Sequence, residues 1–223
     1  HLSIRRQRQM CIRDRSILLL EHNHAFKGLS WHQALFDSLF QSATTRSAGL
    51  QTIDVSHFSD ATNIIMSILM FIGSSPSSVG GGIRTTTFAI LILFIINFNN
   101  TADKTGIKAF NREIHIMDIQ RSFAVFTMAS ILTFVSMIII AATEQGKLTF
   151  IQIFFEVMSA FGTCGLSLGA TDNISNLTKI VLMILMFIGR VGLISFIIIL
   201  AGRKEPDKFS YPKEPVSYTH LRA

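Results

Sequence analysis

The five-residue string Leu-Met-Phe-Ile-Gly occurs at Leu69–Gly73 and again, unchanged, at Leu185–Gly189, 116 residues further along the chain. A Gly-Leu pair that begins at Gly49 has a counterpart at Gly165, at the same offset and 24 residues before the closing glycine of each string. Two separate landmarks that share one offset indicate an internal duplication. The order of parts within each copy therefore sets the architecture.

Each copy contains an apolar helix, a short amphipathic segment, a turn rich in Gly and Thr, and a second apolar helix. The amphipathic segments, Trp31–Thr44 and Thr149–Phe161, are too short to cross a hydrocarbon core about 30 Å thick. We expect each to enter the membrane and turn back, and the alternative is a pair of interfacial helices that lie flat on the surface. The sequence therefore predicts an all-α membrane protein of repeated helix, re-entrant pore-loop, helix modules.

The composition agrees with a membrane protein. Of the 223 residues, 15% are charged and 49% hydrophobic, and the mean hydropathy is +0.45, whereas about a quarter of a soluble domain is charged. Apolar runs that reach or approach the roughly 20 residues of a spanning helix cover 61–73, 86–99, 122–142 and 177–201. The net charge of +6 is divided between loops and chain ends, with no basic face interleaved with aromatic residues. We therefore expect lipid, and no nucleic acid, as a partner.

Changes of composition divide the chain into segments. Residues 1–15 and 216–223 match neither the composition nor the periodicity of the rest, and we expect both to be non-native tails. Lys and Arg concentrate in the stretch between the copies and after the last span, which places both inside the cell. The predicted segments are a first copy with a truncated first helix at 16–102, a cytoplasmic linker at 103–121, a second copy at 122–205, and a cytoplasmic tail at 206–223.

The turn after each amphipathic segment is the candidate ion-binding site. Irregular backbone at membrane depth is tolerated only where it is buried in protein or lines a water-filled path. Glycine permits dihedral angles that aim successive carbonyl groups at one axis, and a ring of carbonyls can replace the water around a dehydrated K⁺ ion. In the alternative, these glycines only cap the re-entrant helices. The eight candidate filter residues are Ser47, Ala48, Gly49, Leu50, Thr163, Cys164, Gly165 and Leu166.

A Gly- and Ser-rich stretch in the first copy alone is the candidate gate. It interrupts what would otherwise be one apolar helix from Ala61 to Phe98, and Gly and Pro here weaken a helix and remove a backbone donor. No lysine follows its glycines, so a Walker-type phosphate site is excluded. We interpret it as a mobile loop beneath the filter, formed by Gly73, Ser74, Ser75, Pro76, Ser77, Ser78, Val79, Gly80, Gly81 and Gly82.

Three charged residues lie inside apolar or amphipathic segments. Arg190 stands near the middle of the run 179–200, where an arginine costs about 2.5 to 3.5 kcal/mol on insertion scales. It is either an electrostatic barrier in the cation path or a packing residue with an ion-pair or carbonyl partner. Asp37 and Glu156 lie in the two amphipathic segments and either attract cations to the outer mouth or form a solvated face.

These stretches closely resemble the membrane (pore) subunit of the Ktr branch of the Trk/Ktr/HKT superfamily of K⁺ transporters. The resemblance covers about 17–205. Its modules are of the K⁺-channel type, and family members carry four of them, of which this sequence resembles the third and fourth. Ser74 and Ser77-Ser78-Val79 depart from the usual family pattern. The matching stretches are Thr44–Gly49, Leu69–Pro76, Gly80–Phe88 and Met186–Gly192.

The resemblance implies a function and partners. It implies that Gly49 and Gly165 are filter glycines, that Gly73–Gly82 is an intramembrane gating loop, and that Arg190 is the positive residue below the filter. It also implies K⁺ uptake across a bacterial plasma membrane by a multi-pass homodimer, with a cytoplasmic nucleotide-binding regulatory ring and Na⁺ as a stimulating ion. The chain is expected to bind no cofactor and to hold K⁺ only at filter backbone carbonyls. Another pore-loop cation channel is the alternative, and an enzyme is not expected because no catalytic constellation lies in the spans.

Overall fold

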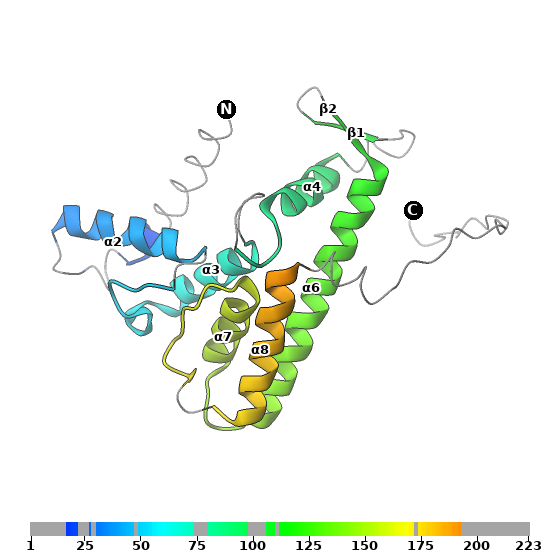
Figure 1. Ribbon diagram of the computed structural model, residues 1–223. Helices are drawn as coiled ribbons and strands as arrows, with labels where there is room; N and C mark the ends of the chain where they lie inside the picture. Colours follow the sequence, from blue (N-terminus) through cyan, green and yellow to red (C-terminus); the bar gives the residue numbers. More distant parts are fainter. Residues whose placement is uncertain are drawn as a thin grey trace, which may run out of the picture.

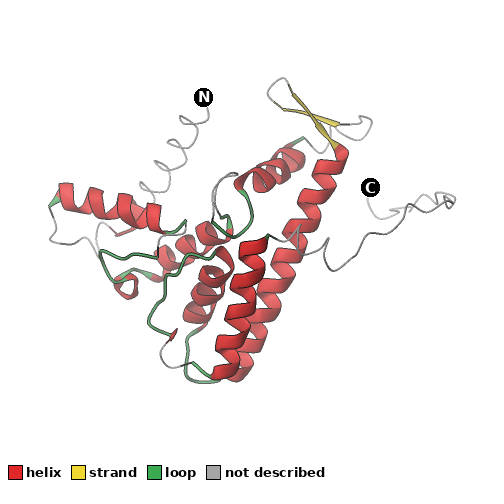
Figure 2. Ribbon diagram, viewed as in Figure 1, coloured by secondary structure: helices red, strands yellow, loops and turns green. Residues whose placement is uncertain are grey.

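The computed structural model describes residues 17–21, 27, 30–46, 49–73, 80–97, 106–109, 112–171 and 174–192. Helices dominate these residues (Figures 1 and 2), which confirms the predicted all-α class. The elements are α2 (Trp31–Thr44), the short 3₁₀ helix η1 (Val55–His57), α3 (Asp60–Phe71), α4 (Thr85–Ile96), β1 (Gly106–Ala109), β2 (Arg112–His115), α6 (Ile116–Thr143), α7 (Phe150–Gly162) and α8 (Asn176–Val191).

The two predicted re-entrant segments are helices α2 and α7, and both begin with a capping box. The side chain of Gln33 accepts a hydrogen bond from the backbone N–H of Ser30 at 3.3 Å, and Gln152 accepts one from Thr149 at 2.9 Å. A residue at the third helical position that reaches back to the N-cap satisfies a donor that the helix itself leaves free. The sequence therefore starts both helices in the same way.

Helix α6 is long and apolar enough to cross a membrane, and it is the single helix in the described part of the chain that meets this criterion. It begins at Ile116, ahead of the predicted apolar run at 122–142 and inside the predicted linker. Its buried side includes Ser122, Ala129 and Thr133, whereas Ile131 and Phe134 are exposed. Small and polar residues at helix contacts with apolar residues outside are typical of membrane helices.

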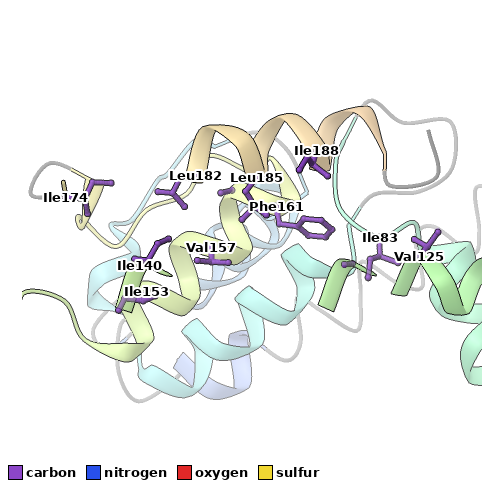
Figure 3. Close-up of a cluster of buried hydrophobic side chains, with 12 residues drawn as sticks. Ile83, Val125, Ile140, Ile153, Val157, Phe161, Ile174, Leu182, Leu185 and Ile188 are labelled. Carbon is purple, nitrogen blue, oxygen red and sulfur yellow. The ribbon is translucent and has the colours of Figure 1, made fainter. Parts of the chain in front are cut away.

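Helix α7 lies at the centre of the fold. It packs against α3, α6 and α8, and Figure 1 shows α7 and α8 side by side along α6. All residues from Phe155 to Gly162 are buried, and Phe161 and Val157 belong to a core cluster that also includes Leu185 of α8 (Figure 3). The interfacial alternative is therefore wrong for α7, because a helix flat on the membrane would keep one side exposed.

Helix α2 is less enclosed. Its buried residues are polar, Ser38, Gln41, Ser42 and Thr44, and its exposed residues include Phe36 and Leu39. Figure 1 shows α2 at the edge of the described structure. The structure therefore leaves both arrangements open for this segment, and a re-entrant α2 stays a prediction.

A two-stranded antiparallel hairpin joins the two copies. Strands β1 and β2 pair with Gly106 opposite His115 and Ala109 opposite Arg112, and β2 leads directly into α6. The sequence predicted a cytoplasmic linker at 103–121 and gave no strands for it. Strands of four residues are too short to give a clear alternating pattern, which explains the difference.

Candidate ion pathway

The two predicted filter turns lie against one another. Gly49 has φ +65° and Gly165 has φ +85°, so both adopt a backbone conformation that residues with a Cβ rarely accept. A Cβ atom at Gly49 would lie 2.9 Å from the carbonyl oxygen of Cys164 and 3.5 Å from the Cα of Gly165. The duplication therefore brings its two glycines into direct contact. Ser47 and Ala48 lie outside the described residues.

Neither glycine caps a re-entrant helix. The C-cap of α2 is Thr45, in the right-handed helical region, and the C-cap of α7 is Thr163, with φ 52° in the left-handed region. Left-handed C-terminal caps are usually Gly or Asn, and a non-glycine residue there is uncommon. The cap alternative for the glycines is therefore wrong, because both stand beyond the helix ends.

Hydrogen bonds fix each turn and join the two copies. In the first copy, the Thr44 hydroxyl accepts from the backbone N–H of Leu50 at 3.1 Å and donates to the Leu50 carbonyl at 2.6 Å. The thiol of Cys164 donates to the carbonyl oxygen of Thr45 at 2.8 Å. Cys164 is buried. Its thiol thus connects the second turn to the C-cap of α2.

The predicted break in the first copy is present, and its far end contacts the second turn. Helix α3 ends at Phe71 and α4 begins at Thr85. The backbone N–H of Gly81 donates to the Thr163 hydroxyl at 3.0 Å, and a Cβ at Gly81 would lie 2.8 Å from that same oxygen. Gly73 is packed so closely that its Cβ would lie 2.0 Å from the carbonyl oxygen of Gly81.

The two other glycines at the end of this stretch, Gly80 and Gly82, lie within the described residues. Gly82 has φ +80° and a Cβ there would lie 3.1 Å from the carbonyl oxygen of Met70. Gly80 is half-buried and has interaction partners. The remaining predicted gate residues, Ser74, Ser75, Pro76, Ser77 and Ser78, with Val79, lie outside the described residues.

Arg190 does not lie in the middle of a continuous helix. Helix α8 ends at Val191, where Gly192 follows with φ +88° as the C-cap, so Arg190 is in the last turn and its side chain is exposed. The sequence placed Arg190 mid-run because the apolar residues continue past position 192. This pattern did not indicate that the helix ends at Gly192. The residue before it, Gly189, has a carbonyl oxygen 3.1 Å from the position of a Cβ at Gly81. Arg190 therefore adjoins the end of the glycine-rich stretch.

Glu156 and Asp37 differ, although the sequence left both with the same two interpretations. Glu156 is 9% exposed. It accepts hydrogen bonds from the hydroxyl groups of Ser167 and Thr171, the latter at 3.5 Å. The solvated-face interpretation is therefore wrong for Glu156. Asp37 is half-buried, and its role stays open.

Two further buried glutamates were missed by the sequence analysis. Glu21 accepts from the backbone N–H of Ser59 at 3.0 Å, from the Ser59 hydroxyl at 2.7 Å, and from the Thr62 hydroxyl. Ser59 is the N-cap of α3. A carboxylate at a helix N-terminus is favoured by the free N–H groups and by the helix dipole.

The second copy repeats this arrangement. Glu144 accepts from the backbone N–H of Ser175 at 2.6 Å and from the Thr178 hydroxyl at 2.9 Å. Ser175 is the N-cap of α8. These hydrogen bonds, first of all those from Ser175, lower the pKa of Glu144 from 4.5 to about 2, and the nearby Lys147 ammonium adds to the effect.

A sequence signal for these glutamates existed. Ser59 and Thr62 correspond to Ser175 and Thr178 at the offset of 116 residues. Glu21 and Glu144 are not separated by this offset. The chain from Glu144 to the start of α8 is shorter than the chain from Glu21 to the start of α3. The repeated Ser-x-x-Thr pattern could have predicted two equivalent helix starts. The glutamate that bonds to each pair could not be identified without the fold.

The fold and the site define a class: a helical membrane protein with two duplicated units whose glycine turns lie close together. The family model described as "TrkH: Cation transport protein" matches residues 13–211. The chain therefore belongs to the TrkH family of cation transport proteins, which confirms the resemblance at the level of the family. The members of this family are named as transporters, which agrees with the prediction that the chain is not an enzyme.

Curated relatives and a solved structure are similar over most of this chain. The Ktr system potassium uptake protein D of Bacillus subtilis is 51% identical over 201 residues, which cover 90% of this chain and 44% of that protein. The Ktr system potassium uptake protein B of Vibrio alginolyticus is 33% identical, over 80% of this chain and 38% of that protein. The chain thus spans less than half the length of these relatives.

The fold is that of a known K⁺ transporter. The crystal structure of the potassium transporter TrkH from Vibrio parahaemolyticus matches with a TM-score of 0.72 at 20% sequence identity. The match covers 86% of this chain and 42% of that chain. At this identity the likeness concerns the fold alone, and it agrees with the predicted helical membrane architecture.

Proposed function

We propose that this chain forms the third and fourth helix, pore-loop, helix repeats of the pore subunit of a K⁺ uptake transporter. The observation that carries the proposal is the contact between Gly49 and Gly165, two glycines of positive φ from equivalent places in the two copies. A duplicated module that turns back at glycine, with its two turns in contact, suits a path formed around a shared axis.

In the proposed filter, K⁺ binds to backbone carbonyls of the two turns. No side chain needs to coordinate the ion, since carbonyl oxygens replace its hydration shell. The fixed conformation of the turns supports this role, because Thr44 and Cys164 hold the backbone on either side of the glycines. K⁺ is the substrate in this proposal, and the chain needs no bound cofactor.

The proposed gate is the stretch from Gly73 to Gly82, together with Arg190. The bond from Gly81 to the Thr163 hydroxyl supports a link between gate and filter, since a movement of the loop would break a contact to the residue that starts the second turn. The placement of Gly81 beside Gly189 supports a common level for the loop and the arginine. A positive charge at that level repels a cation, so Arg190 limits leak in this proposal. A purely structural role for Arg190 is the alternative.

The proposal includes a location and partners. The chain acts in a bacterial plasma membrane as a multi-pass protein in contact with lipid, and the membrane potential drives uptake with about 2.3 kcal/mol per charge per 100 mV. The curated relatives are named as members of a "Ktr system", which supports a cytoplasmic nucleotide-binding regulatory ring as a partner. A homodimer and stimulation by Na⁺ complete the proposal.

The second candidate is another type of pore-loop cation channel subunit. The four-fold channels of that class use equivalent modules, whereas the two modules here differ. The first copy alone has the broken helix between Phe71 and Thr85, and Arg190 corresponds to Ser74 in the first copy. These differences favour the transporter.

Complementation tests the proposal. The complete reading frame that contains this chain is expressed in a bacterial strain without its own K⁺ uptake systems, and growth is measured at low external K⁺. We expect rescue of growth together with K⁺-dependent uptake. Normal amounts of the protein in the membrane without rescue would overturn the proposal, and uptake that does not distinguish K⁺ from other cations would favour the channel.

A further inference from the structure

A buried carboxylate on helix α7 is bonded to the segment that directly follows the second filter turn. The two oxygens of Glu156 accept from different residues, one from the Ser167 hydroxyl and the other from the Thr171 hydroxyl. Ser167 is the second residue after Gly165. Glu156 therefore ties the helix that leads into the turn to the chain that leaves it.

Ser167 extends this tie into a small network. Its hydroxyl accepts from the backbone N–H of Gly169 at 3.1 Å and lies 2.9 Å from the Thr171 hydroxyl. An ionised carboxylate only accepts hydrogen bonds, and here hydroxyl donors meet both of its oxygens. Burial of a carboxylate is costly unless such partners are present. The network therefore compensates the buried charge and at the same time fixes the exit of the turn.

The carboxylate at the equivalent place in the first copy is not bonded in the same way. Asp37 corresponds to Glu156 when the two capping boxes are aligned, at an offset of 119 residues. Its side chain is half-buried and has no hydrogen bond to the described residues of its own turn. In its place the neutral Gln41 amide donates to the Ile53 carbonyl at 3.0 Å. Within the described residues, a carboxylate therefore braces the second turn alone.

We propose that Glu156 is a positioning residue for ion selectivity. It holds the chain after Gly165 in one conformation through Ser167, so that the carbonyls of the second turn keep the spacing that a dehydrated K⁺ ion needs. The inference rests on the proposed K⁺ uptake function. It predicts that the hydrogen bonds, and not only the negative charge, determine selectivity.

Four variants of the full-length transporter test this role: Glu156→Ala, Glu156→Gln, Ser167→Ala and the control Asp37→Ala. Initial uptake of Rb⁺, as a substitute for K⁺, and of Na⁺ is measured in cells without other uptake systems, and the ratio of the two rates is compared. We expect the ratio to fall about tenfold in Glu156→Ala, a change equivalent to about 1.4 kcal/mol. Ser167→Ala should lower the ratio in the same direction, and Asp37→Ala should leave it unchanged.

The remaining comparisons separate hydrogen bonding from charge. Glu156→Gln keeps an acceptor for Ser167 and should retain most of the selectivity. The double variant Glu156→Ala with Ser167→Ala should be no less selective than Glu156→Ala alone, because effects of groups in one network do not add.

Two outcomes would overturn the inference in a wild-type protein that takes up Rb⁺. Unchanged ratios in Glu156→Ala and Ser167→Ala, at normal membrane amounts, would remove the positioning role. A loss of Rb⁺ uptake in Glu156→Gln with an unchanged ratio, and no effect of Ser167→Ala, would show that the charge only attracts cations. If Glu156→Ala does not reach the membrane, Ser167→Ala and Glu156→Gln decide. A wild-type protein without Rb⁺ uptake would instead contradict the proposed function.

Discussion

At the scale of single residues, the effect of backbone conformation can be separated from the effect of space by comparing two glycines of positive φ. Gly49 has φ +65°, and a Cβ would meet the Cys164 carbonyl at 2.9 Å. Gly146 has φ +79°, and a Cβ would meet nothing within 4 Å. Both positions therefore impose the same backbone strain on a substituted residue, whereas only the first also imposes a contact with the opposite turn.

We predict that Gly49→Ala abolishes K⁺ uptake and that Gly146→Ala, in the connection between α6 and α7, leaves most of it. Each substitution pays roughly 1 to 2 kcal/mol for the left-handed conformation, and Gly49→Ala must in addition displace the Cys164 carbonyl. Uptake rates in complemented cells, corrected for the amount of membrane protein, provide the measurement. Equal losses in both variants would mean that backbone strain alone, and not the contact between turns, accounts for the defect.

Individual residues differ in how well the sequence alone predicts their position and contacts. Gly49 and Gly165 could be predicted because the duplication gave each an equivalent partner. The bond from Glu156 to Ser167 could not, since it depends on how the chain folds back after the turn. The exposed position of Arg190 was missed because an apolar run alone does not show where a helix ends.

At the scale of elements, the helices approach closely through glycines. A Cβ at Gly189 of α8 would lie 2.2 Å from the carbonyl oxygen of Phe161 in α7, and a Cβ at Gly162 would lie 2.6 Å from that of Met70 in α3. Distances this short cannot be relieved by a side-chain rotation, because the opposing atoms belong to the backbone. Small residues of this kind let membrane helices pack in direct backbone contact.

We predict that Gly189→Ala destabilises the protein strongly, by about 1 to 3 kcal/mol as for other overpacked sites. Helix α8 must move away from α7 to admit the methyl group. The apparent melting temperature of the purified full-length protein in detergent is the measurement. Met183→Ala, at an exposed position of α8, is the control, and a fall in the melting temperature no larger than in this control would contradict the close contact.

The glutamate caps lead to a dependence of stability on pH. The folded-state pKa of Glu144 is about 2 and its ordinary value is 4.5. A carboxyl group with a lowered pKa contributes stability that is fully present above its unfolded-state pKa and is lost as the pH falls through its folded-state pKa. The contribution of Glu144 is therefore constant near neutral pH and decreases between about pH 5 and pH 2.

We predict that Glu144→Gln lowers the melting temperature at pH 7 and flattens its decline between pH 5 and pH 3. The amide keeps an acceptor for Ser175 and loses the charge that favours the helix N-terminus. Asp118→Asn, in the exposed first turn of α6, serves as the control for an exposed carboxylate at a helix N-terminus and should lower the melting temperature at pH 7 less than Glu144→Gln does. Parallel pH profiles for the wild type and Glu144→Gln would rule out this cap as the source of the pH dependence.

The sequence predicted the bounds of some helices well and missed other elements. The segment Trp31–Thr44 coincides with α2, and Thr149–Phe161 coincides with α7 and its N-cap, because polar caps and Gly/Thr turns mark these boundaries locally. The start of α6 at Ile116 and the hairpin before it were not predicted. Their residues lack such local signals. The strands are defined by the pairing of β1 with β2, which the sequence pattern does not show.

At the scale of the whole molecule, the two copies form one structure through contacts that cross between them. Helix α3 of the first copy packs on α7 of the second, and α4 packs on α6. The bonds from Cys164 to Thr45 and from Gly81 to Thr163 also cross between the copies. A membrane supplies no hydrophobic force between helices, so close packing and hydrogen bonds of this kind must hold the copies together.

These contacts predict that the copies stay associated when the chain between them is cut. The full-length transporter is made as two polypeptides that separate between residues 109 and 112, where β1 is joined to β2. A tag on one part is used for purification. We expect the untagged part to copurify and K⁺ uptake to persist, because the hairpin only connects α4 to α6 whereas the packing of α3 on α7 lies elsewhere. Gly162→Leu in the cut protein is the matched variant, since a larger side chain at this position must displace the Met70 backbone and separate α7 from α3. If the two parts of the Gly162→Leu protein copurify as completely as those of the unsubstituted cut protein, the α3–α7 contact does not hold the copies together. If only the tagged part is recovered from the unsubstituted cut protein, the covalent connection holds them together.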